Sequence, residues 1–206
     1  MKGLLLDLVV QRCEKEDRSI HQIVLDEAIE LASKLTVEQM DVLTINFIIS
    51  RAQSNEIVNL DTLLAHIDRD ILPFISTLEI ETSCYEHLTY LGAATVEYTG
   101  DVPQMYVGYA KKYNGVFSKG IKLEDFEAVF AEDEKARKLM MQCLQYPNLY
   151  QVAVLNEKQL DDACTHHGIT EEIKVKLSAL MNNSTMTPLE IKEWLVEKRP
   201  KINKLF

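Results

Sequence analysis

The chain has 206 residues, with 22 basic and 32 acidic side chains and a formal net charge of −10. Hydrophobic residues make up 47% and charged residues 26%, which is the mixture of a folded globular protein and excludes a disordered chain. Seven glycines and five prolines exclude collagen-like and linker-rich chains. They also disfavour an all-β fold, which needs a turn every ~8–12 residues. The composition therefore predicts a helical protein.

The acidic excess lies entirely in the first half of the chain. Residues 1–100 contain 7 basic and 17 acidic side chains, whereas residues 101–206 contain 15 of each. An acidic surface repels phosphate backbones and anionic lipids, so we expect no nucleic-acid partner. Apolar runs such as 4–6 and 47–49 are far shorter than the ~20 residues of a membrane span. We expect a cytoplasmic protein without a membrane span, whose scattered cysteines are reduced (Cys13, Cys84, Cys143 and Cys164).

Helical periodicity dominates the first 92 residues, which we expect to form a helical bundle. A helix is expected over 3–15, and a second one begins after Ser19, which forms a capping box with Gln22. The apolar stripe of this second helix comprises Ile20, Ile23, Val24, Ala28, Leu31 and Leu35, with Glu27 beside them.

The third helix is the best candidate for the centre of the core. It begins with a capping box of Thr36 and Gln39, extends to about residue 51, and is apolar on most of its sides. A fourth helix starts at the N-cap Asn59 and is ended or kinked by Pro73, and a fifth spans about 79–91 before Gly92.

Residues 93–155 form an irregular or mixed segment that we expect to pack on the bundle. Four of the seven glycines and four tyrosines lie between 93 and 120. Within that stretch, residues 95–98 are compatible with an extended conformation, and 104–113 with either a short helix or a loop. Helices are expected over 123–130 and 134–144, and one short strand over 149–155.

The last part, 156–206, is predicted to contain three short helices; the alternative to three separate parts is that they all form one domain. Asn156 with Gln159 caps the first, Thr170 opens the second, and Thr187-Pro188-Leu189-Glu190 opens the third. The inward face of the third comprises Ile191, Trp194 and Leu195. The basic residues near the end (Lys198, Arg199, Lys201 and Lys204) are expected to offset the helix dipole or to contact an acidic partner.

Motifs of known chemistry are missing from the sequence. The glycines fit neither phosphate-binding pattern, and neither HExxH nor GxSxG occurs. Cysteine and histidine are zinc ligands, so we considered a zinc site formed by Cys84, His87, Cys164, His166 and His167. The set lacks a second spaced pair, however, so we predict no metal site, no cofactor and no assigned catalytic residue.

Tyrosines define the candidate ligand-binding residues. Tyrosine offers a large contact area at low entropic cost together with a polar hydroxyl group. A pocket between the bundle and residues 93–120 would be lined by His87, Tyr98, Tyr106, Tyr109 and Tyr113. The alternative is that this segment only packs onto the body of the protein.

Several segments resemble an uncharacterised bacterial family of helical proteins with a variable N-terminal leader. They are LLLDLVVQR (4–12), IHQIVLDEA (20–28), KLTVEQ (34–39), FII (47–49), LPFI (72–75), YEHL (85–88), VLNEK (154–158), and EIK (190–192) with Arg199-Pro200. These are core and capping patterns, so the resemblance implies kinship and no chemistry. It also implies that this chain is the truncated core of a longer protein and that the family has a loose link to bacterial defence or conflict.

Two functions remain open at this point. The first is a non-enzymatic interaction or scaffold module of a longer bacterial protein, which self-associates or binds a protein partner; missing motifs and abundant apolar helix faces favour it. The alternative is a ligand-sensing or enzymatic domain that uses the pocket beside 93–120.

Overall fold

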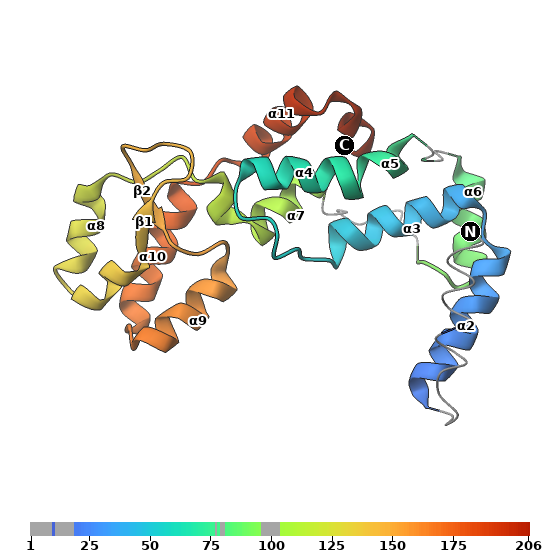
Figure 1. Ribbon diagram of the computed structural model, residues 1–206, viewed down its shortest axis with the longest axis horizontal. Coiled ribbons are helices and arrows are strands. Elements are labelled where there is room, and N and C mark those ends of the chain that lie inside the picture. The colour runs from blue at the N-terminus through green and yellow to red at the C-terminus, as the bar shows by residue number, and fades with distance from the viewer. Residues whose placement is uncertain (1–9, 11–18, 77, 79–80, 96–103) are drawn as a thin grey trace. The chain divides into compact units, whose positions relative to one another are not determined.

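The computed structural model describes residue 10 and the ranges 19–76, 78, 81–95 and 104–206. In this part of the chain the fold is mainly α-helical, with one two-stranded antiparallel sheet (Figure 1). The expected helical fold class with at most one strand pair is thereby confirmed. The helix expected over 3–15 and the residues Cys13 and Tyr98 fall outside the described residues.

The regular elements follow one another closely along the chain. The α-helices are α2 (Ile20–Lys34), α3 (Val37–Ser50), α4 (Leu60–Asp70), α5 (Leu72–Ile75), α6 (Thr82–Tyr90), α7 (Met105–Lys112), α8 (Leu123–Phe130), α9 (Glu157–His167), α10 (Glu171–Asn183) and α11 (Pro188–Lys198). The 3-10 helices are η1 (Asn114–Phe117), η2 (Glu134–Leu139) and η3 (Pro200–Leu205). Strands β1 (Met140–Gln142) and β2 (Tyr150–Val152) pair with Met141 opposite Gln151. No helix among the described residues is long and apolar enough to cross a membrane.

Most helix starts lie where the sequence predicts them, because side chains satisfy the free N–H groups of the first turn. The Ser19 hydroxyl accepts a hydrogen bond from the N–H of Gln22, and Thr36 and Gln39 form a reciprocal capping box. Asn59 caps α4. Just after the C-terminal end of α6, Gly92 has φ +69°, a conformation that favours glycine. These local signals therefore fix the helix boundaries.

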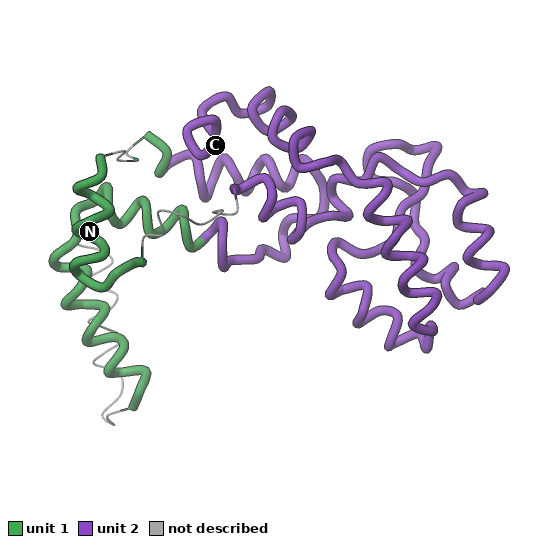
Figure 2. Tube along the Cα trace, turned by 180° about the vertical axis from the view of Figure 1, so that it is seen from behind, with its two compact units in different colours: residues 1–47, 74–102 green, residues 48–73, 103–206 purple. Residues whose placement is uncertain are grey.

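The chain divides into two compact units (Figure 2). Unit 1 consists of residues 1–47 and 74–102, and unit 2 of residues 48–73 and 103–206. The boundaries therefore differ from the expected parts 1–92, 93–155 and 156–206. The expected division into these three parts stays a prediction.

Two expectations about the helices are wrong. Helix α3 is not the centre of the core, because only Gln39 and Ile45 are buried on it and Phe47 is 60% exposed. The helix expected over 134–144 is replaced by η2 followed by β1. The reason is that residues 140–142 pair with β2 across the turn that contains Pro147, and this ladder satisfies their backbone groups instead of a helix.

Unit 2 holds a well-defined apolar cluster around the small sheet. Residues from α8, η2, β2, α9 and α10 contribute side chains that are at least nine-tenths buried, including Phe126, Leu160 and Leu177. The rings of Phe126 and Phe130 stack at 5.6 Å. In another part of the same unit α7 packs against α11, with Tyr109, Ile191 and Leu195 buried. Helix α11 is thus anchored by the face that carries Ile191 and Leu195, while Glu193 and Glu197 on it are exposed.

Candidate functional site

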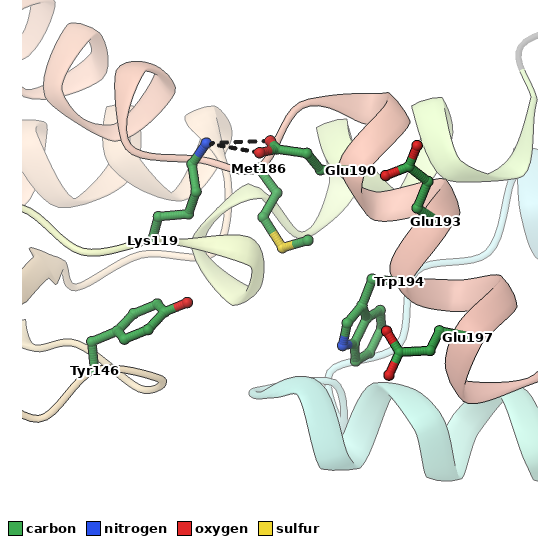
Figure 3. Close-up of a pocket in the computed structure, with 7 residues that line it drawn as sticks. All are labelled: Lys119, Tyr146, Met186, Glu190, Glu193, Trp194 and Glu197. Carbon is green, nitrogen blue, oxygen red and sulfur yellow. Dashed lines mark hydrogen bonds and ion pairs between the residues drawn. The ribbon is translucent and has the colours of Figure 1, made fainter.

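A hollow of about 350 Å³ lies beside α11 in unit 2 (Figure 3). Its lining consists of Lys119, Tyr146, Met186, Glu190, Glu193, Trp194 and Glu197. Four of these seven residues come from α11, so the start of this helix determines where they stand.

The start of α11 is fixed by a complete capping box. The Thr187 hydroxyl accepts a hydrogen bond from the N–H of Glu190, and the Glu190 carboxylate accepts one from the N–H of Thr187 at 2.6 Å. Pro188 occupies the first turn, where no N–H donor is required. The burial of Ile191 and Leu195 fixes the rotation of the helix about its axis. As a result, Glu190, Glu193 and Glu197, spaced i, i+3 and i+7, share one face.

Backbone pairing brings Lys119 next to the start of α11. Ser118 and Thr185 form an isolated antiparallel bridge, and the N–H of Met186 donates to the carbonyl oxygen of Phe117 at 3.0 Å. From this position the Lys119 ammonium pairs with the Glu190 carboxylate at 3.2 Å. Hydrogen bonds from the backbone of Thr187 and from Lys119 lower the pKa of Glu190 below its usual range. Glu190 is therefore both a capping residue and an ion-pair partner.

Tyr146 approaches the hollow from the turn between β1 and β2. The N–H of Leu149 donates to the carbonyl oxygen of Tyr146 at 2.9 Å, which closes this turn. The neighbouring Gln145 side chain donates to the carbonyl oxygen of Val116 at 2.8 Å and ties the turn to η1. Trp194 packs edge-to-face on Phe117, with ring centroids 6.3 Å apart. Tyr146 and Trp194 lie on opposite sides of the hollow (Figure 3).

The lining carries an excess of negative charge. Three carboxylates face a single ammonium group, that of Lys119, and Lys119 is already paired with Glu190. Glu197 contacts its sequence neighbour Lys198 at 2.9 Å, whereas no ion pair of Glu193 occurs within the described residues. Carboxylates at i, i+4 on one helix repel each other, and Glu197 also lies near the negative end of the helix dipole. Glu193 and Glu197 thus oppose the stability of α11 unless a cation joins them, whereas Glu190 stabilises its start as a cap.

Cation binding is the chemistry that this arrangement supports. Ammonium and guanidinium groups are attracted to the faces of Trp and Tyr rings and to carboxylates. The hollow combines both features with the thioether of Met186, which adapts to the shape of an alkyl chain. The seven lining residues include no His, Cys, Ser or Asp.

The residues that the sequence suggested as a ligand site fall in both units. His87 belongs to α6 in unit 1, is exposed, and contacts the Gln39 side chain through Nδ1 at 2.9 Å. Tyr106 is on α7 in unit 2, where its ring meets that of Phe206 at 5.3 Å. Tyr98 lies outside the described residues.

Tyr109 and Tyr113 belong to the interior of unit 2. They are 2% and 1% exposed, and their ring centroids are 5.7 Å apart. The Tyr113 hydroxyl accepts a hydrogen bond from the N–H of Ser54 at 2.8 Å, whereas the buried Tyr109 hydroxyl finds no partner within the described residues. Burial raises the pKa of both phenols above their usual value. A ligand-lining role for these tyrosines stays a prediction.

Gln39 forms a polar junction beside a second hollow, in unit 1. Its amide donates to the carbonyl oxygen of Cys84 at 3.2 Å, and its oxygen accepts from the N–H of Thr36. The adjoining hollow has a volume of about 270 Å³ and is lined by Thr36, Glu38, Gln39, Ser83 and Cys84. Gln39 lies on α3 and hydrogen-bonds both to Thr36, just before this helix, and to a carbonyl group of α6. This junction therefore joins α3 and α6.

The set of residues weighed as zinc ligands is divided between the two units. Cys84 and His87 are in unit 1, and Cys164, His166 and His167 are at the end of α9 in unit 2. Across the described residues, no group of three or more His, Cys, Asp or Glu side chains is arranged to hold a metal ion.

Sequence reasoning singles out two residues of the hollow beside α11, Glu190 at the start of the helix and Trp194 on its inward face. Trp194 was placed on the inward face of its helix, although it is half-buried and lines the hollow. The signal that could have found the site is the spacing of Glu190, Glu193 and Glu197 around this single tryptophan. Lys119 and Tyr146 are brought to the hollow only by the tertiary structure, so no local sequence pattern predicts that they line it.

A protein-family model with the description ":-like" matches residues 1–206, the whole chain. This description names no reaction, ligand or partner. Neither the curated proteins nor the solved structures contain a significant match.

Proposed function

The chain belongs along its whole length to the family described as ":-like", and we propose that it is a non-enzymatic protein-interaction module. In this proposal the hollow beside α11 holds a lysine or arginine side chain of a partner protein. We further propose a bacterial, cytoplasmic setting with a loose link to defence, which is the setting that the sequence resemblance implies.

The observation that carries the proposal is the combination of two aromatic side chains on opposite sides of one hollow with an excess of carboxylates in its lining. A basic side chain would place its alkyl stem against Met186 and Trp194 and its charge between Glu193 and Glu197. The positive charge would relieve the repulsion between Glu193 and Glu197. The partner would therefore gain affinity by removing an unfavourable interaction that is present in the free protein. An aromatic ring adds ~0.5–2 kcal/mol to the binding of a cation, depending on how far water is excluded.

Trp194 provides a direct test because it is the only tryptophan in the chain. We would titrate the protein with the methylamides of Nα-acetyl-lysine and Nα-acetyl-arginine and follow tryptophan fluorescence. Nα-acetyl-norleucine methylamide has a similar stem without the charge and serves as the control ligand. We expect saturable changes with the two cations and none with norleucine.

Variants separate binding at the hollow from general attraction to an acidic protein. We expect Glu193→Gln and Glu197→Gln to weaken binding several-fold each, whereas Glu86→Gln, an exposed carboxylate on α6, leaves it unchanged. Equal affinity for the charged and uncharged ligands would refute the proposal, as would equal losses in all three variants.

Self-association, which the sequence also suggested, stays a prediction. Light scattering over a wide concentration range tests it, because an oligomer dissociates on dilution and a monomer does not change.

A further inference from the structure

Helix α2 in unit 1 has two apolar faces. One face is covered and includes Gln22, Leu25 and Ala32. The opposite face carries Ile20, Ile23 and Val24, which are 82%, 39% and 54% exposed. Residues at i, i+3 and i+4 lie on one side of a helix, so these three side chains form a continuous stripe, which we call the α2 stripe.

The α2 stripe lies in the strongly acidic unit. The sequence of unit 1 contains 5 basic and 14 acidic residues, a net charge of −9, whereas unit 2 contains 17 and 18. Glu27 is one turn beyond Val24 on the stripe and is exposed, and Glu30 beside it pairs with Lys34 at 2.6 Å. An apolar stripe with an acidic surround is therefore the chemical character of this face.

We propose that the α2 stripe binds a cationic amphipathic helix of a partner protein. The spacing of the three apolar side chains matches that of a second helix with apolar residues at i, i+3 and i+4. Positive charges on that helix would complement the −9 of unit 1 and speed the encounter. A second copy of this chain would present the same negative charge and be repelled. The inference does not depend on the hollow beside α11, which belongs to unit 2.

The experiment uses the full chain and a synthetic helical peptide made of leucine and lysine, with leucine at i, i+3 and i+4. A second peptide has glutamate in place of each lysine. Both carry a fluorophore, and binding is followed by anisotropy in a protein that also carries Glu193→Gln and Glu197→Gln, so that the hollow does not contribute. We expect the lysine peptide alone to bind, with an affinity that falls as salt is added.

A pair of matched valines identifies the surface. Val24 on α2 and Val175 on α10 are 54% and 58% exposed. We expect Val24→Ser to weaken binding of the lysine peptide three- to tenfold and Val175→Ser to leave it unchanged. Equal binding by both variants would overturn the proposal.

The other possible occupants of the stripe predict different results. If a second copy covered it, light scattering would show a dimer that Val24→Ser dissociates and that salt strengthens. If the stripe packed against the chain itself, Val24→Ser would lower the melting temperature and leave peptide binding intact. Either result would overturn the proposal.

Discussion

A Cβ atom on Gly115 would lie 2.1 Å from the carbonyl oxygen of Val154, too close for any side chain. The N–H of Gly115 donates to the carbonyl oxygen of Leu155 at 3.0 Å, so η1 and the segment after β2 approach each other through their backbones. Any residue larger than glycine must separate these segments, and both are tied into unit 2 by further hydrogen bonds.

We therefore expect Gly115→Ala to lower the free energy of unfolding by about 3 kcal/mol or more, the upper range for an overpacked interior. Gly108 on α7 is the matched control, because an added Cβ there would be 3.6 Å from the nearest atom. Gly108→Ala should leave stability unchanged or raise it by ~0.5–1 kcal/mol, because alanine favours helix. Urea denaturation measures both, and equal effects would contradict the close approach.

The end of α11 is connected to α4 by an ion pair between Arg199 and Asp68. The guanidinium donates to both carboxylate oxygens, which lowers the pKa of Asp68 below its usual value. A lowered carboxylate pKa contributes stability that is present above the unfolded pKa of about 4 and is lost as the pH falls through the folded value. We expect Arg199→Gln to be less stable than the native chain at pH 7, with a difference that vanishes in acid.

Thermal unfolding at several pH values checks this prediction. Lys201→Gln is the control, because it removes an exposed positive charge two residues away. If Lys201→Gln has the same pH-dependent effect as Arg199→Gln, the contribution comes from net charge and the pair itself adds nothing.

Glu190 should give the start of α11 a second acid-sensitive contact. Its pKa is lowered, so its hydrogen bond to Thr187 and its pair with Lys119 persist at neutral pH and are lost as the pH falls through that lowered value. Glutamine at this position keeps a capping box but cannot pair with lysine. We expect Glu190→Gln to be slightly less stable at pH 7, by an amount that does not persist in acid.

Thr187→Ala should lower the free energy of unfolding by about 1 kcal/mol both at pH 7 and in acid, since it removes the N-cap hydroxyl itself. Circular dichroism during urea denaturation distinguishes the two variants. A Glu190→Gln variant whose deficit stays constant down to low pH would contradict the role assigned to the carboxylate.

Gln39 is expected to be the residue that stabilises unit 1 most among its buried polar groups. It is 3% exposed and bonded to Cys84 and Thr36, so its removal breaks both of these hydrogen bonds. We predict that Gln39→Ala lowers the free energy of unfolding by about 1–3 kcal/mol. Gln53→Ala, at an exposed position, should change it little, and a similar loss in both would disprove the junction.

Much of the secondary structure could be predicted because its signals are local. The caps at Ser19, Thr36, Asn59 and Thr187 act within one helical turn, and all four lie where the pattern places them. The sequence is compatible with either a helix or a loop at α7. The helix forms because Tyr109 and Met105 are buried within unit 2. That burial is a tertiary effect and has no local signature.

The candidate site could not be predicted for the same reason. Lys119 and Glu190 are 71 residues apart and meet only because residues 117–119 pair with 184–186. Periodicity groups Trp194 with Ile191 and Leu195, and the α2 stripe with the other apolar residues of its helix, because it shows which side chains share a side of a helix. It does not show whether another part of the chain covers that side.

The buried cysteines offer a way to follow each unit separately. Cys84 lies in unit 1, and Cys143 and Cys164 lie in unit 2, all three shielded from solvent. A thiol-modifying reagent can reach each of them only when the surrounding structure opens transiently, so peptide-resolved alkylation rates would report local unfolding. The chain thereby carries native probes that can show whether the two units open together or independently.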